Sequence, residues 1–242
     1  MIILHIILLL SIAIFVLAVI SMYESNKKKA EIKEQREKSV HSLFPNAQII
    51  LNDGVNLFFK DDTQKVFGTD CSGKTYSYAG LQSVICYKDC VDLYHEYNCI
   101  SIGASPRLDT LTAISEIDVD TICSEMLPIV KRNLYLYLKN HNIRPTHEYY
   151  HQGEIWGCDI NSKKFYTTCA SPQIYDFGEL KKVTIEDLSN NRLCSANYLI
   201  HVVVRKEDDL TDFDDEYDLY FQAQDVLYFN FLSFFKGIKN RA

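Results

Sequence analysis

The sequence lacks the short motifs that most often identify an enzyme. It contains no G-x-S-x-G nucleophile elbow, no G-x-G-x-x-G dinucleotide fingerprint and no paired C-x-x-C spacing. A serine hydrolase, a dinucleotide-dependent oxidoreductase and a structural zinc site therefore have no support, and we assign no catalytic, cofactor-binding or metal-ligating residues and no cofactor. An excess of positive charge is also missing, because the net charge is −7. Such a surface is repelled by nucleic acid, so we expect no nucleic-acid partner.

The eight cysteines form no tight repeating framework. We interpret them as ordinary buried thiols in a reducing compartment. An even number would also fit disulfides in an oxidising compartment, and the sequence leaves this alternative open. The positions are Cys71, Cys86, Cys90, Cys99, Cys123, Cys158, Cys169 and Cys194.

One long apolar run, Ile2 to Met22, is interrupted only by His5, Ser11 and Ser21. A helix rises ~1.5 Å per residue, so a run of this length reaches across a hydrocarbon core of ~30 Å. A cleaved signal peptide would need a basic segment before the run and a small-x-small site after it, and neither is found. The run predicts a retained transmembrane helix at residues 1–22.

Basic residues gather on one side of this run. None precedes it, whereas six follow it closely, namely Lys27, Lys28, Lys29, Lys33, Arg36 and Lys38. The positive-inside rule then predicts a single-pass protein of the cell membrane with its C-terminal region in the cytoplasm. Residues 23–41 should continue the helix as a charged juxtamembrane stalk, because residues 24–40 contain no Gly or Pro. The basic cluster could also attract anionic lipid headgroups, although setting topology is the simpler role.

Beyond the stalk the sequence changes to short segments rich in Ile, Val, Phe and Tyr, separated by turn clusters such as Asn52-Asp53-Gly54. This pattern is typical of antiparallel strands and hairpins. Apolar periodicity predicts two helices, between Asp118 and Asn140 and between Ala223 and Lys239. Pro128 should kink the first helix or mark a restart. The predicted fold class is α+β, mostly antiparallel β.

A shift of 99 residues aligns two parts of the chain without a gap. Six identical residues result, because Lys65, Thr69, Ser72, Tyr76, Leu81 and Val84 meet Lys164, Thr168, Ser171, Tyr175, Leu180 and Val183. We interpret the match as a duplication that gives two related β-rich units, residues 42–144 and 145–242, each closed by a helix. Chance similarity between two hairpin-rich segments is the alternative.

The segment that begins Phe59-Lys60-Asp61 and continues through Gly73-Lys74, Tyr76-Ser77-Tyr78, Leu81 and Val84 resembles the start of bacterial pleckstrin-homology-like domains. These domains are small β-barrels closed by a C-terminal helix. The resemblance covers about 35 residues of each copy. It implies a module that binds a partner protein, a peptide or a lipid, and the acidic composition argues against phosphoinositides.

Two motifs offer an enzyme as the alternative. Gly68 to Thr75 matches the nucleotide-binding P-loop G-x-x-x-x-G-K-[ST]. A P-loop opens a helix, yet Tyr76-Ser77-Tyr78 predicts a strand, so a hairpin turn with a left-handed Gly73 is the simpler interpretation.

The second motif is His147 to His151, which matches the H-E-x-x-H pattern of zinc hydrolases. On a helix the two imidazoles share one face and bind zinc. Pro145, Gly153 and two adjacent tyrosines favour a strand here, on which Glu148 would point away from both histidines.

The stretch Glu207 to Asp218 contains eight acidic residues among twelve. Tyr217 stands where a calcium loop needs its glycine, so we expect a solvated hairpin tip between strands at 199–205 and 217–221. Taken together, these features predict a membrane-anchored binding or scaffold protein with a protein partner that the sequence leaves unidentified.

Overall fold

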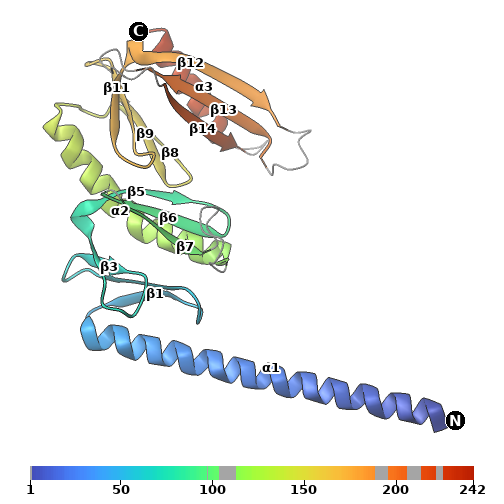
Figure 1. Ribbon diagram of the computed structural model, residues 1–242. Helices are drawn as coiled ribbons and strands as arrows, with labels where there is room; N and C mark the ends of the chain where they lie inside the picture. Colours follow the sequence, from blue (N-terminus) through green and yellow to red (C-terminus); the bar gives the residue numbers. More distant parts are fainter. Residues whose placement is uncertain (1, 97, 104–112, 189–195, 206–213, 222–225) are drawn as a thin grey trace.

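The computed structural model describes residues 2–96, 98–103, 113–188, 196–205, 214–221 and 226–242, and of residues 2–13 and 226 it describes the backbone only. Over these residues the fold is α+β, with mostly antiparallel sheets and three α-helices, as the sequence predicts. Figure 1 shows a long N-terminal helix that projects from one end of a body in which sheets and helices are stacked.

Helix α1 spans Ile2–Leu43 without interruption. The absence of glycine and proline explains this continuity, since nothing in residues 2–43 breaks the backbone hydrogen-bond ladder. Apolar side chains between residues 14 and 22 are exposed, among them Phe15 (69%) and Leu17 (66%). The part of the chain that the structure describes contains no helix that is both long and apolar enough to cross a membrane.

The C-terminal end of α1 packs on the first sheet. This sheet has four strands in the order β1-β2-β3-β4, at Gln48–Asn52, Leu57–Asp61, Val66–Gly68 and Tyr76–Ser77. Val40 of α1 is buried with Leu57 and Phe59 in a small cluster. The stalk helix is therefore joined to the body by side-chain packing as well as by the chain.

A single 3₁₀ turn, η1 (Tyr78–Gly80), leads from β4 into a second sheet in the order β5-β6-β7. These strands span Leu81–Cys86, Cys90–His95 and Asn98–Gly103. Helix α2 (Glu116–Asn140) follows and packs on β5 and β1, with Ser115 as its N-cap. The helix continues through Pro128, so of the two predicted effects, a kink or a restart, the restart does not occur and the kink stays a prediction. Proline removes one backbone donor, and packing of the apolar face outweighs that loss.

The same order of elements follows α2. A four-stranded sheet, β8-β9-β10-β11, comprises His147–His151, Glu154–Asp159, Lys164–Thr167 and Gln173–Asp176. The 3₁₀ turn η2 (Phe177–Glu179) leads to the three-stranded sheet β12-β13-β14, at Leu180–Asp187, Tyr198–Val204 and Asp215–Phe221. Helix α3 (Val226–Lys239) ends this series and packs on β12 and β8.

We call residues 48–140 the first half and residues 147–239 the second half. Between the halves, β1 and β8, η1 and η2, and the starts of β5 and β12 are each separated by 99 residues. The β2–β3 hairpin matches the β9–β10 hairpin at 98 residues, because Asp61 faces Val66 as Asp159 faces Lys164. One buried apolar cluster is centred on each half, and the cluster of the first half also includes Ile155 and Tyr166 of the second.

The helices α2 and α3 follow the shift less well. Their last residues, Asn140 and Lys239, are separated by the same 99 residues. Val130 is nevertheless fully buried, whereas Phe229, 99 residues later, is 63% exposed. The two helices therefore turn different faces toward their sheets under this shift.

The cysteines depart from the expectation of ordinary thiols. Cys86 on β5 and Cys123 on α2 form a disulfide, and Cys99 is exposed. A disulfide was the alternative that the sequence left open. The spacing of 37 residues gave no sign of this pair because the two residues meet only when α2 packs across β5.

Candidate functional site

The P-loop look-alike at residues 68–75 connects β3 to β4, and the chain continues as strand, 3₁₀ turn and strand. Gly73 has φ +85°, which is the predicted left-handed conformation. Asp70 accepts hydrogen bonds from the backbone N–H and the hydroxyl of Ser72, and the Lys74 ammonium lies 5.2 Å from the centre of the Tyr76 ring. The helix N-terminus that would bind phosphate is absent from this position. The lysine therefore contacts an aromatic ring in a hairpin.

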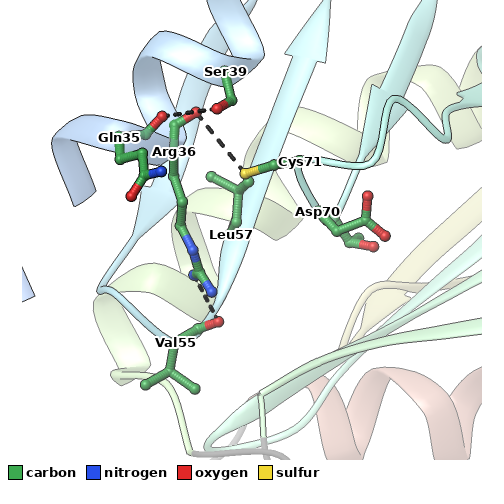
Figure 2. A pocket seen from close by; sticks show the side chains of 8 residues that line it. Gln35, Arg36, Ser39, Val55, Leu57, Asp70 and Cys71 are labelled. Atoms are coloured by element: carbon green, nitrogen blue, oxygen red, sulfur yellow. Dashed lines mark hydrogen bonds between the residues drawn. The ribbon is translucent and has the colours of Figure 1, made fainter. Parts of the chain in front are cut away.

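This loop borders a cleft of about 350 Å³ between α1 and the first sheet. Figure 2 shows the Arg36 side chain crossing this cleft from α1. Its Nη1 donates to the carbonyl oxygen of Val55 at 2.9 Å, and the Cys71 thiol donates to the carbonyl oxygen of Arg36 at 3.9 Å. Burial raises the pKa of Cys71, so this thiol is a weak nucleophile. The cleft is consequently a seam that fixes the stalk helix to the sheet.

The H-E-x-x-H motif forms strand β8, as the neighbouring proline and glycine predict. His151 is buried and stacks on Phe221 at 4.2 Å. Glu148 points to the other face of the sheet, as expected for a residue adjacent to His147 on a strand. Among the residues that the structure describes, no group of three or more His, Cys, Asp or Glu is placed to hold a metal.

Glu148 has a structural partner set that the sequence did not reveal. Its carboxylate accepts hydrogen bonds from Tyr135 of α2 at 2.7 Å, from Tyr166 of β10 at 2.8 Å and from Tyr150 at 3.2 Å. Lys131 of α2 lies 3.5 Å from the same carboxylate. We name these five residues the Glu148 cage. Because two of its members belong to α2, the cage joins the first half to the second.

A turn from the second half reinforces this joint. The carbonyl oxygen of Gln152 accepts a hydrogen bond from the Cys86 backbone N–H at 2.8 Å. Gly153 follows with φ +85°, and a Cβ there would lie only 2.5 Å from the carbonyl oxygen of Val84. Only glycine fits this approach. The β8–β9 turn therefore docks on β5 directly beside the disulfide.

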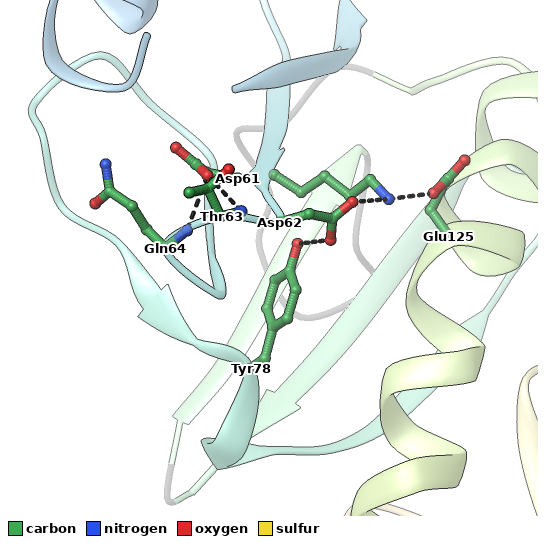
Figure 3. Close-up of polar contacts among 7 residues, drawn as sticks. Asp61, Asp62, Thr63, Gln64, Tyr78 and Glu125 are labelled. Atoms are coloured by element: carbon green, nitrogen blue, oxygen red, sulfur yellow. Dashed lines mark hydrogen bonds and ion pairs between the residues drawn. The ribbon is translucent and has the colours of Figure 1, made fainter. Parts of the chain in front are cut away.

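A second polar cluster holds α2 against the first sheet, as Figure 3 shows. Lys60 of β2 pairs with Glu125 of α2 at 2.6 Å and with Asp62 at 3.1 Å. The Tyr78 hydroxyl donates to Asp62 at 2.9 Å. Burial alone would raise the pKa of Asp62, but hydrogen bonds from Lys60 and Tyr78 outweigh it and lower that pKa. This charge-paired cluster fixes the position of α2 on its sheet.

A hollow of about 330 Å³ lies beside this cluster, between η1 and α2. Its lining combines apolar side chains, among them Ile129 and the 55% exposed Leu136, with the cations Arg132 and Lys65 and with Asp62, whose carboxylate already binds Lys60 and Tyr78. Within the described residues Arg132 has no ion-pair partner. Such a lining suits an apolar peptide that carries an acidic residue.

The acidic stretch at 207–218 lies mostly outside the described residues, which resume at residue 214. The Arg205 guanidinium donates two hydrogen bonds to Asp214 and lowers the pKa of that carboxyl. Strands β13 and β14 flank the stretch, close to where the sequence places them. The structure thus describes the base of this hairpin and leaves its tip untested.

Comparison with known proteins gives no relative from which a function could be transferred. No protein-family model, no curated protein and no solved structure matches the chain.

Proposed function

We propose that the chain is a single-pass, membrane-anchored binding or scaffold protein whose body consists of two pleckstrin-homology-like units. One observation carries this proposal. Helix α1 runs unbroken from the apolar residues into the seam with the first sheet, so an anchor and a folded body share one rigid element. An enzyme needs no such coupling, and both enzyme motifs lie in hairpin and strand segments.

The two-unit architecture has support from the strand order. The four-stranded sheet, 3₁₀ turn, three-stranded sheet and helix recur in the same order in both halves. The differing buried faces of α2 and α3 limit the repeat to the sheets. Divergence of a closing helix after duplication would give this result, because a helix can rotate on a sheet whereas strands are held by register.

The membrane anchor has support from the 21-residue run Ile2 to Met22, of which all but three residues are apolar, and from the exposure of those whose side chains are described. An exposed apolar run of this kind marks a site of burial in lipid or in another protein. Full-length chain and a variant without residues 2–22 should be expressed and fractionated. The full chain should remain in membranes after alkaline carbonate extraction, and the shortened variant should be soluble. Equal behaviour of the two proteins would refute the anchor.

The orientation of the body is a separate question because two observations oppose each other. Six basic residues after the apolar run favour the cytoplasm. A disulfide is more typical of oxidising compartments. We propose the cytoplasmic orientation, since the basic flank acts during insertion whereas a cysteine pair can stay reduced. Asp214→Cys in a variant that lacks the other cysteines should resist an impermeant maleimide in intact cells, and labelling before lysis would reverse the orientation.

Protein binding has support from the hollow beside Arg132. A photo-crosslinking amino acid at Leu136 should yield discrete adducts in cells. Arg132→Glu should abolish them, because reversal of the charge repels an acidic ligand. The same crosslinker at Phe229 of α3, which is similarly exposed, is the matched control. Identical adducts from both positions, or adducts that persist in Arg132→Glu, would count against a specific site.

A further inference from the structure

We propose that the turn between β1 and β2, residues 53–56, together with the adjoining basic part of α1, forms a docking surface for anionic lipid headgroups. This inference rests on the proposed membrane anchor. It adds that the body touches the bilayer surface at a defined place, whereas an anchor on a flexible linker would leave the body free of it.

The first step is the position of the turn along α1. An added Cβ on Gly54 would lie 3.8 Å from the carbonyl oxygen of Lys29 and 3.9 Å from the Lys33 side chain. Asn52 donates a hydrogen bond to the carbonyl oxygen of Lys33 at 3.0 Å. Arg36 holds the other side of the turn through the carbonyl oxygen of Val55 at 2.9 Å. The turn is therefore fixed at the level of residues 29–33.

The second step is the distance from that level to the apolar run, which ends at Met22. The seven residues from Met22 to Lys29 rise by about 10 Å in a helix. The headgroup layer extends roughly 5–8 Å beyond the hydrocarbon core on each side. Electrostatic attraction reaches about another 8 Å at physiological salt. A helix that spans the bilayer thus brings the turn to the outer edge of the headgroups.

The third step is the chemistry of this surface. Lys27, Lys28 and Lys29 stand between the apolar run and the turn, and Lys33 lies beside Gly54. Glu24 and Glu31 share this stretch, so its four lysines and two carboxylates leave a net charge of 4 − 2 = +2. Two further acids are held within the protein. Asp53 accepts hydrogen bonds from the backbone N–H groups of Val55 and Asn56 at 2.7 Å, and Glu34 pairs with Lys38. Cations next to a bilayer attract anionic lipid within about a Debye length.

The turn also carries an exposed apolar side chain. Val55 is 53% exposed, although its carbonyl oxygen is held by Arg36. Gly54 has φ +96°, a conformation that disfavours other residues, so the turn holds a defined shape. An exposed valine that directly follows Gly54, the residue that lies against Lys29 and Lys33, matches a headgroup layer, where apolar and charged groups meet.

The test measures how close three positions of the full chain lie to the lipid headgroups. The protein is placed in vesicles that contain a lipid spin-labelled at its headgroup, which quenches the fluorescence of nearby tryptophan. Single substitutions Tyr23→Trp, Val55→Trp and Leu43→Trp probe sites that are all exposed. The native Trp156 is fully buried and gives a constant background. Emission should be quenched strongly at position 23, clearly at position 55 and negligibly at position 43, which lies roughly 30 Å along the helix from Met22.

Lipid charge separates docking from simple proximity. Quenching at position 55 should be greater in mixed phosphatidylcholine–phosphatidylglycerol vesicles than in phosphatidylcholine alone. Replacement of Lys27, Lys28 and Lys29 by glutamine should remove this difference. Quenching at 23 without quenching at 55 would overturn the docking surface and leave the anchor intact. Absence of quenching at 23 would overturn the anchor itself.

Discussion

The two halves of the body share a strand order but stabilise it in different ways. The first half is closed by a disulfide and by the charge-paired cluster of Lys60, Asp62 and Glu125. The second half relies on aromatic packing, in which Trp156 meets both Phe231 and Phe235 edge to face. Strand order is thus compatible with two kinds of core, since backbone pairing fixes topology while side chains only have to fill the space.

The helix that precedes each half contacts that half at an equivalent position. Helix α1 precedes the first half and contacts it through Arg36, and helix α2 precedes the second half and contacts it through Tyr135. These two residues are 99 positions apart. Helix α2 also closes the first half. It therefore serves both halves, and this double role explains why its buried face differs from that of α3.

The largest expected effect tests whether equivalent aromatic residues of the two halves contribute equally to the stability of the protein. Phe177 and Tyr78 occupy the same place in η2 and η1 and are 2% and 8% exposed. Replacement of either by alanine should destabilise the protein by about 3–5 kcal/mol, because a buried ring leaves a cavity. Urea unfolding measures the loss. Tyr78→Phe, which removes only the hydrogen bond to Asp62, should cost about 1 kcal/mol. A small cost for only one alanine variant would break the equivalence.

The disulfide should stabilise the first half by about 3–4 kcal/mol, a contribution that the second half lacks. Closure of a 37-residue loop restricts the unfolded chain by that amount. Residues 99 positions after Cys86 and Cys123 are Ile185 and Gln222, so the second half has no counterpart. Dithiothreitol should lower the melting temperature of the wild type and leave Cys123→Ala unchanged. Free thiols at both positions in protein taken directly from cells would mean that the bond does not form there.

The joint between the halves should contribute less. Glu148→Gln removes the negative charge to which three tyrosines donate hydrogen bonds and with which Lys131 pairs. The free energy of unfolding should fall by about 1–3 kcal/mol. Glu186→Gln on the exposed part of β12 is the matched control and should stay within about 0.5 kcal/mol. Differential scanning fluorimetry with urea titration measures both. An unchanged stability of Glu148→Gln would show that the cage is not a structural joint.

Much of the local structure could be predicted from the sequence. Aromatic alternation predicted a strand at residues 76–78, of which residues 76–77 form β4 and Tyr78 begins η1. The flanking Pro145 and Gly153 and two adjacent tyrosines predicted the strand at 147–151, and the absence of breakers predicted the long α1. Gly73 was correctly assigned a left-handed turn because its position between two strands demands one. Local physics decides such features, so sequence reasoning reaches them.

The contacts between distant residues could not be predicted. The Glu148 cage gathers side chains from α2, β8 and β10, and no spacing in the sequence relates them. The Cys86–Cys123 pair likewise forms only because α2 packs across β5, which the spacing of the two cysteines does not predict. The restart predicted at Pro128 failed because a local preference was outweighed by burial of Met126 and Val130 on either side of it. Tertiary packing decides these features.

The smallest effect concerns two aspartates at the same turn of each half. Asp159 and Asp61 are both buried, and each accepts hydrogen bonds from two backbone N–H groups of its hairpin. Asp159 also accepts one from the Arg144 N–H at 3.0 Å. The residue 99 positions before Arg144 is Pro45, which has no N–H. Within the described residues, the corresponding oxygen of Asp61 has no hydrogen-bond partner.

This difference should appear in how the stability contributed by Asp159 depends on pH. Burial alone would raise the pKa of Asp159, but the hydrogen bonds from Arg144, Ser162 and Asn161 outweigh it and lower that pKa. A lowered folded pKa stabilises the protein above the unfolded value of about 4, and this stability is lost as the pH falls through the folded pKa. Asp159→Asn should therefore cost about 1–2 kcal/mol at pH 7 and progressively less below about pH 4. Asp61→Asn should cost less at pH 7, because its carboxylate lacks the third donor. Urea unfolding of both variants across this pH range makes the comparison, and equal losses at pH 7 would show that the Arg144 N–H adds nothing to the second half.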